Sequence, residues 1–335
     1  MNHLMSKHTS VLPFAVLLVL GSTQSWAVPV TSAASYAYGN SNISPPSPLT
    51  DSDSQTSNSG VPLTLTSSVI DSKIVDSANS SRTIQAESSV HVQAGMIQLY
   101  ASSVASAHDY GPNSYVSANA NTSATGSWSD TFTIDGGSLN GTVGHLVAGF
   151  RVDGSLASSF DSSANWQASL DEQFRAQLRL TSSATGQDVF LKGGKRHLVN
   201  ANGDQLLAVS GFTDFSSPGV YTISLDFKFG SPIQMYMWGD AYAYTSAFAN
   251  NSGTAGYIYP DSNISAVADF GHTINWGGFL GLTDAQGNAV SSYTVTSLSG
   301  LDYGVASVPE PETYAMIMTG LGFVVFATRR RKQNA

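Results

Sequence analysis

The 335-residue sequence contains no cysteine. This absence excludes a disulfide framework, a thiol nucleophile and thiolate metal ligands. Stability must therefore come from the burial of apolar side chains, and a 41% content of hydrophobic residues is enough for a sizeable core.

Basic side chains are also scarce. Of the 14 Lys and Arg residues, Lys7 precedes the main body of the chain and four form the cluster 329–332. Residues 28–308 keep 9 basic and 21 acidic side chains, because Glu310 and Glu312 also lie outside them, and their net charge is −12. Such a charge opposes binding to nucleic acid or to an anionic membrane surface, and it favours solubility or association with cations. We therefore expect no nucleic-acid partner.

Recognisable catalytic motifs are missing as well. The histidines of residues 28–308 include no His-x-x-x-His pair, and the chain has no Gly-x-Ser-x-Gly elbow or phosphate-binding glycine loop. His108-Asp109 and Asp171-Glu172 could supply acid and base groups to a glycosidase-like site, although exposed loop positions are the favoured interpretation. We predict no catalytic residue, no metal ligand and no cofactor.

Long apolar runs are confined to the two ends of the chain. The first, Val11–Leu20, follows Lys7 and precedes Ser25-Trp26-Ala27, a small-x-small sequence typical of signal-peptide cleavage sites. The run is too short to span a bilayer, and Pro13 disfavours the alternative of a buried core helix. We therefore interpret residues 1–27 as a secretory signal peptide that is cleaved after Ala27.

The second apolar run, residues 314–328, lies between Val308-Pro309-Glu310-Pro311 and Arg329-Arg330-Arg331-Lys332. Uncharged apolar residues can enter a bilayer, whereas consecutive cations cross it only at high cost. We therefore expect a single C-terminal transmembrane helix at 314–328 that stops at a basic cytoplasmic end, 329–332. Its helical length of about 22 Å is less than the ~30 Å hydrocarbon core, so it suits a short-lived anchor.

This tail resembles the PEP-CTERM sorting signal of Gram-negative bacteria, in which a Pro-Glu-Pro motif precedes a short hydrophobic helix and an Arg-rich end. The resemblance covers residues 308–332. The same tail also bears the name ice-binding protein C-terminal domain. The resemblance implies that an exosortase, a membrane-embedded cysteine peptidase, recognises and removes the tail.

The resemblance also implies a route through the cell. Before processing, the protein is held in the inner membrane with its passenger in the periplasm. The processed passenger then reaches the cell surface or the extracellular matrix, usually in species that make exopolysaccharide. The partners implied are therefore exosortase, the inner membrane before processing and, as a candidate, exopolysaccharide.

Residues 28–60 are dominated by Ser, Asn, Thr, Pro and Asp. They hold too few apolar residues to fold by themselves, so we predict a disordered linker. Asp51 and Asp53 resemble the start of a calcium loop, but Thr56 stands at the sixth position where glycine is expected, and the twelfth position has no Glu.

Residues 61–307 alternate between apolar and polar residues in the manner of β-strands. The clearest example is 220–229, which places Tyr221, Ile223, Leu225, Phe227 and Phe229 on one face. The stretch 166–180 fits a helix or a strand, and the neighbouring strands favour a strand. We predict an all-β passenger that folds as an antiparallel, jelly-roll-like sandwich.

Aromatic residues lead to the most specific functional hypothesis. Trp238 and Trp276, with the tyrosines near Trp238, could form a flat platform for sugar rings, although packing inside the sandwich is the favoured alternative. We rank a structural or interaction protein of the exopolysaccharide matrix first, a carbohydrate-binding module second and a polysaccharide-active enzyme third.

Overall fold

The computed structural model describes most of the passenger, namely residues 29–41, 49–57, 61–75, 80–109, 115–161, 168–209, 211–212, 219–250 and 261–305. The predicted signal peptide with its cleavage site at Ala27, and the predicted sorting signal, transmembrane helix and basic end at 308–332, lie outside these residues. Within the described ranges, no helix has the length and apolar character that a membrane span requires.

The described residues form β-strands joined by turns, with one short 3₁₀ helix, η1 (Gly137–Leu139). The strands are β1 (Val30–Ser41), β2 (Leu49–Ser57), β3 (Leu63–Val75), β4 (Ser80–Gln93), β5 (Met96–His108), β6 (Tyr115–Asp135), β7 (Val143–Asp161), β8 (Ser169–Ser182), β9 (Gln187–Asn200), β10 (Gly203–Ala208), β11 (Gly219–Lys228), β12 (Pro232–Asn250), β13 (Ser262–Asp284) and β14 (Thr294–Ser297).

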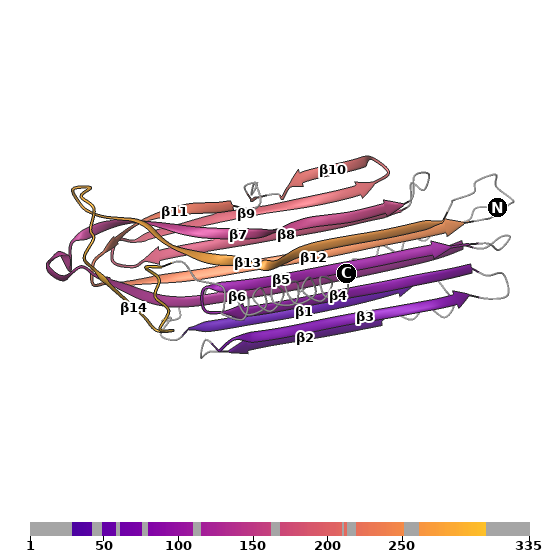
Figure 1. The fold of residues 1–335 in the computed structure, drawn as a ribbon, viewed down its shortest axis with the longest axis horizontal. Helices are drawn as coiled ribbons and strands as arrows, with labels where there is room; N and C mark the ends of the chain where they lie inside the picture. The colour runs from indigo at the N-terminus through magenta and orange to yellow at the C-terminus, as the bar shows by residue number, and fades with distance from the viewer. Residues whose placement is uncertain are drawn as a thin grey trace, which may run out of the picture.

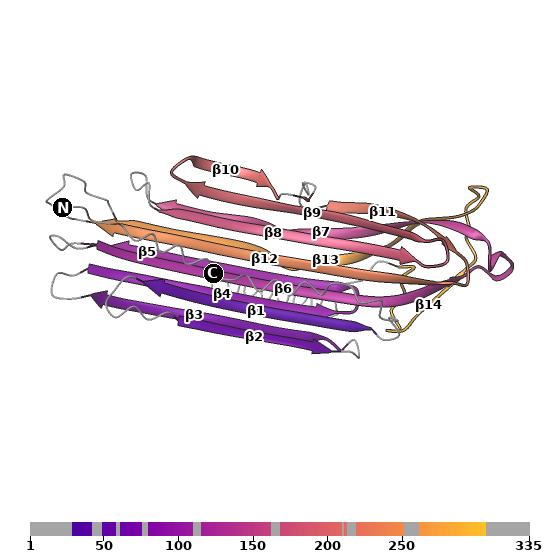
Figure 2. The ribbon, with the colours of Figure 1, turned by 180° about the vertical axis from the view of Figure 1, so that it is seen from behind.

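Two antiparallel sheets make up the fold. The larger sheet has eight strands, in the order β10-β9-β8-β12-β6-β1-β2, with β14 paired to the end of β6. The smaller sheet has six, in the order β11-β7-β13-β5-β4-β3. The strands of both sheets run along the long axis, and the sheets face each other as an elongated sandwich (Figures 1 and 2). The prediction of an all-β, antiparallel sandwich is confirmed, and the jelly-roll-like assignment stays a prediction.

Strand β11 behaves as its alternation predicts. Ile223, Leu225 and Phe227 are buried, and Phe229 just beyond the strand is buried as well, whereas Val220 on the opposite face is 57% exposed. The ambiguous stretch 166–180 falls mainly in strand β8, which buries every second side chain. The strand interpretation of that stretch is therefore confirmed.

The prediction of a disordered linker at 28–60 is wrong for the residues that form β1 and β2. Strand β1 pairs with β6 along its whole length, and β2 pairs with β1. Inward-facing Ala33 and Ala37 are buried, and the Ser35 and Ser67 hydroxyl groups are 2.7 Å apart. A segment too polar to fold alone can still join a sheet, because the neighbouring strand satisfies its backbone hydrogen bonds. Asp51 and Asp53 lie within β2 and not in a calcium loop.

The core changes in character along the sandwich. One part is lined by alanines of both sheets, including Ala105, Ala118, Ala243, Ala247 and Ala266. The other part holds large side chains, including Trp128, Phe132, Phe150, Phe227, Trp276 and Tyr303. Between them, Gly126 and Gly239 lie opposite each other on β6 and β12. A Cβ atom at Gly126 would lie 2.7 Å from the Ile97 side chain, so these positions require glycine for the sheets to approach.

Candidate functional site

Aromatic side chains gather on the outer face of the larger sheet, the face turned away from the smaller sheet. Strand β12 points Met235, Met237, Ala241 and Ala243 into the core, where each is at most 1% exposed. The alternate side chains therefore point outward and are half-buried, and they include Tyr236, Trp238, Tyr242 and Tyr244. Strand β1 follows the same rule, with Ala37 inward and with Tyr36 and Tyr38 outward.

We call seven outward side chains of the larger sheet the aromatic face: Tyr36, Tyr38, Phe190, Tyr236, Trp238, Tyr242 and Tyr244. Tyr36 and Tyr38 stack with an interplanar angle of 7° and a centroid distance of 6.4 Å. Cations contact two other rings. The Arg175 guanidinium lies 5.4 Å from the centroid of Trp238, and the Lys192 ammonium lies 4.8 Å from that of Phe190, which is 56% exposed.

The outer face of the smaller sheet is different. Among the side chains that the structure describes, Tyr100 of β5 is the only Phe, Tyr or Trp on this outer face. Its other outward side chains are mainly small or charged, such as Ser106 on the same strand and Glu87 on β4. The aromatic face is therefore a property of one side of the sandwich.

Phenol groups of the aromatic face contact polar side chains of β6. The Tyr244 hydroxyl group donates to Asn119 Oδ1 at 3.4 Å. Burial raises the pKa of Tyr236, and a hydrogen bond to Ser127 partly opposes the increase. Burial also raises the pKa of Tyr242 and Tyr244, with a contribution from the charge of Asp171. These phenols therefore stay protonated at neutral pH, and each can both donate and accept hydrogen bonds.

Each of three arginines beside the aromatic face forms an ion pair with an aspartate. Arg196 makes a bidentate pair with Asp171, at 2.8 and 2.6 Å. Arg179 makes another with Asp188, at 2.7 Å for each bond, and this hydrogen bonding lowers the pKa of Asp188. Arg175 Nε donates to Asp240 at 2.9 Å. Burial raises the pKa of Asp240, and the charge of Arg175 opposes the increase.

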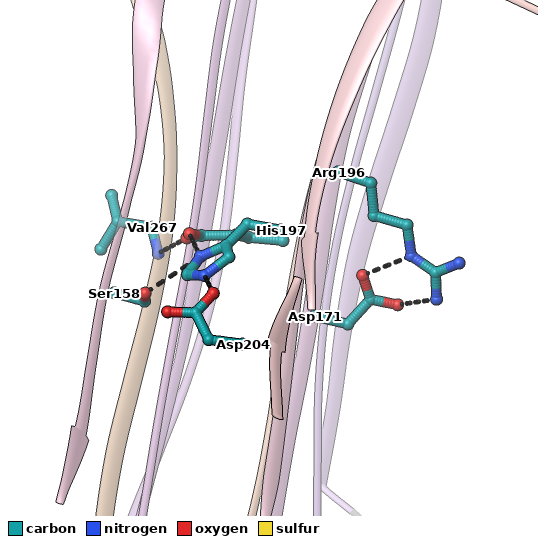
Figure 3. Close-up of polar contacts among 7 residues, drawn as sticks. Ser158, Asp171, Arg196, His197, Asp204 and Val267 are labelled. Carbon is teal, nitrogen blue, oxygen red and sulfur yellow. Dashed lines mark hydrogen bonds and ion pairs between the residues drawn. The ribbon is translucent and has the colours of Figure 1, made fainter. Parts of the chain in front are cut away.

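Asp171 and Glu172 do not form an acid pair, because neighbouring residues of a strand point to opposite faces. Asp171 lies on the outer face with Arg196, whereas Glu172 points inward and is fully buried. Figure 3 shows the Asp171–Arg196 pair on one side of the strands and His197 with Asp204 and Ser158 on the other. The structure therefore separates two residues that a two-carboxylate mechanism would need on one side.

The inward cluster consists of Glu172, His197, Asp204 and Ser158. His197 Nδ1 lies 2.7 Å from Glu172 and 3.1 Å from Ser158 Oγ, and its Nε2 lies 2.7 Å from Asp204. The second oxygen of Glu172 accepts a hydrogen bond from the Val267 backbone at 3.0 Å (Figure 3). The cluster therefore connects β7, β8, β9, β10 and β13.

Protonation determines what this cluster can do. Burial lowers the pKa of His197, but its hydrogen bonds to Glu172 and Asp204 outweigh burial and raise it overall. Burial raises the pKa of Glu172, and the hydrogen bond from His197 opposes the increase. When both ring nitrogens donate to carboxylates, no lone pair remains to take a proton from Ser158. The geometry fits a cross-strand clamp.

The remaining acid–base candidate, His108-Asp109, lies where β5 ends. His108 Nδ1 is 2.9 Å from Asp261 Oδ2, and the Asp109 backbone donates to Asp261 Oδ1 at 3.3 Å. These contacts join the end of β5 to the start of β13. Within the described residues, no group of three or more His, Asp or Glu side chains is arranged to hold a metal ion.

The structure separates the two tryptophans of the predicted platform. Trp238 lies on the aromatic face, but Trp276 is 0% exposed in the core, so its assignment as a sugar contact is wrong. The Trp276 indole donates to the Tyr303 carbonyl at 2.9 Å, and the Tyr303 hydroxyl group donates to Asp130 at 2.8 Å. Sequence analysis also missed Tyr36 and Tyr38, because they lie in the segment that we interpreted as a linker.

Comparison with known proteins identifies one segment. Residues 307–332 match the PEP-CTERM protein-sorting motif, and this match contains Val308-Pro309-Glu310-Pro311 and the basic cluster 329–332. No curated protein and no solved structure matches the chain. The motif marks an exported protein that is processed by an exosortase and reaches the cell surface.

Proposed function

We propose that this exported, exosortase-processed protein attaches to extracellular polysaccharide at the cell surface, and that the aromatic face makes the contact. The observation that carries the proposal is the outward placement of large aromatic rings on β1 and β12, where tyrosines and Trp238 face outward and many of the core positions between them are alanines. Large apolar rings usually stabilise a fold by burial, so their outward placement favours a binding role.

The chemistry of the aromatic face suits sugars. Sugar rings present apolar C–H faces that stack on aromatic rings, and their hydroxyl groups need polar partners around those rings. Protonated phenols and the Ser, Thr and Asn side chains of β6 supply such partners. A structural or interaction role in the exopolysaccharide matrix then follows from attachment of a folded sandwich to the polymer.

In this proposal, residues 1–27 direct export and are cleaved after Ala27. The helix at 314–328 and the cations at 329–332 then hold the passenger on the periplasmic side of the inner membrane. Exosortase cuts near Pro309-Glu310-Pro311, and the released passenger joins the matrix.

Binding by processed protein from the host cell tests the proposal. We expect Trp238→Ala and Tyr36→Ala each to weaken retention in native gels containing the host's exopolysaccharide by about tenfold, since ~1.4 kcal/mol of lost contact energy corresponds to this factor. Tyr100→Ala is the matched control, because Tyr100 is also half-buried but lies on the outer face of the smaller sheet. Equal retention of all three variants would contradict a role for the aromatic face.

A second candidate rests on charge. The net charge of −12 over residues 28–308 could link the protein to acidic polymers through divalent cations. Such contacts weaken as salt screens them, whereas stacking on aromatic rings is short-range and changes little. Retention that disappears at high salt, and that Trp238→Ala leaves unchanged, would favour this candidate over the aromatic face.

A further inference from the structure

We infer that the polysaccharide is an uncharged, extended chain that lies along β6, and this inference rests on the proposed function. The outward side chains in the middle of β6 are small, polar and uncharged, and they alternate with buried alanine, threonine and glycine. We call them the β6 strip: Asn119, Asn121, Ser123, Thr125 and Ser127.

Aromatic side chains border part of the β6 strip on both sides, whereas Thr125 lies between Ala34 and Asp240. On one side Tyr242 of β12 is opposite Ser123, and on the other side Tyr36 of β1 is opposite the same residue. Neighbouring strands are ~4.8 Å apart, so the two flanking strands are separated by about 10 Å, and a single chain along β6 could reach side chains of both.

The length and direction of the strip favour an extended polymer. Side chains on one face of a strand recur every ~6.8 Å, so the strip is about 27 Å long and continuous. Its rows of hydroxyl and amide groups run parallel to the strand direction. A chain lying along β6 can therefore contact the same kinds of groups repeatedly, as a polymer of similar sugar units requires.

Two hydrogen bonds between the strip and β12 are long, and a ligand can replace them. Tyr244 donates to Asn119 at 3.4 Å, and Thr125 Oγ1 donates to Asp240 Oδ2 at 3.4 Å. Bonds of this length are weak, so exchange for sugar hydroxyl groups costs little. Ser, Thr and Asn side chains both donate and accept, as sugar hydroxyl groups do.

The distribution of charges on the outer face of the larger sheet favours an uncharged polymer. The strip and the outward side chains of β1 carry no charge. On the neighbouring strands Arg175, Arg179 and Arg196 are each paired with an aspartate of the same face, so an acidic sugar would have to displace an internal carboxylate. The net charge of −12 over residues 28–308 further disfavours the approach of a polyanion at low salt.

A charge placed in the strip tests the inference. The protein used is the complete passenger after export and exosortase processing. We expect Ser123→Glu to reduce retention by hydroxyethylcellulose, a soluble uncharged β-glucan, by at least tenfold, because it buries a carboxylate under the polymer. Ser106→Glu is the matched control, since Ser106 faces outward on β5 of the smaller sheet. Asn121→Asp, which adds charge with little change in volume, should act in the same direction. Thermal unfolding of each variant checks that it folds.

The outcomes separate this inference from the proposed function. Glucan binding that is lost in Trp238→Ala but unchanged in Ser123→Glu and Asn121→Asp would overturn the path along β6 and leave the aromatic face intact. Retention by alginate, a uronic-acid polymer, that exceeds retention by the glucan would overturn the uncharged class. An absence of binding to glucan, alginate and the host's own exopolysaccharide would reject the proposed function itself.

Discussion

His197 contacts a carboxyl group that is fully removed from solvent. Glu172 is 0% exposed, and His197 is its side-chain partner with a 2.7 Å contact. We expect His197→Ala to lower the free energy of unfolding by about 3 kcal/mol, because removal of one partner leaves a buried carboxylate uncompensated. Asp204→Asn is the control and should change stability little, since Asp204 is 74% exposed. Chemical denaturation of the processed protein measures both.

The same pair predicts how stability depends on pH. The pKa of His197 is raised from 6.5, so its contribution is complete below pH 6.5 and is lost as pH rises through the folded-state pKa. The pKa of Glu172 is raised from 4.5, so the folded state also holds this proton more tightly and loses stability as the carboxyl ionises. Both shifts have the same sign. The free energy of unfolding should therefore fall as pH rises above 6.5, and a rise over that range would contradict the clamp.

Asp171 and Glu172 show a limit of predicting sites from sequence alone. Alternation predicts that Asp171 and Glu172 point to opposite faces, but it cannot tell which face is the core when both faces carry apolar or aromatic residues. Trp238 and Trp276 both lie in strands, and only the packing of the second sheet makes one an outer residue and the other a core residue. An aromatic platform could therefore be proposed from the sequence, but the residues that belong to it could not be predicted.

Among the elements, the strands that bury large apolar side chains and expose polar ones were predictable. Strand β11 buries Ile223, Leu225 and Phe227, so its pattern of hydrophobic residues coincides with its buried face. Strand β1 has the reverse arrangement, because Ala33 and Ala37 are buried while Tyr36 and Tyr38 face outward. Its inner residues are too small to give a hydrophobic signal, and it depends on β6 and on the facing sheet for its stability. A composition-based prediction therefore assigned it to a linker.

The membership of β1 in the sandwich can be tested with two alanines of the same strand. Ala37 is 0% exposed in the core, whereas Ala34 faces outward and is half-buried. We expect Ala37→Asp to destabilise the protein by about 3 kcal/mol or more, since it buries an unpaired carboxylate, and Ala34→Asp to have a small effect. Urea denaturation of the two variants gives the comparison. Equal, negligible effects would mean that residues 30–41 do not pack in the sandwich.

At the scale of the whole molecule, the two outer faces of the sandwich differ in composition. The net charge of −12 over residues 28–308 favours solubility, while the arginines beside the aromatic face pair with aspartates of the same sheet. In the proposed function, close-range contacts with a polymer are therefore made through the larger sheet of an elongated sandwich (Figure 1). Under this proposal, attachment through the larger sheet leaves the smaller sheet exposed to the surrounding matrix.

Delivery of this body depends on the tail, which lies outside the described residues. Pro309 and Pro311 disfavour a helix in the residues before the apolar run, so we expect this segment to be extended where the exosortase recognises it. We expect replacement of Pro309-Glu310-Pro311 by three alanines to leave uncleaved protein in the inner-membrane fraction, and immunoblots of fractionated cells measure this. Gln333→Ala, just beyond the matched residues 307–332, is the control and should be processed normally. Release of the triple variant at the control's rate would show that the exosortase reads another part of the tail.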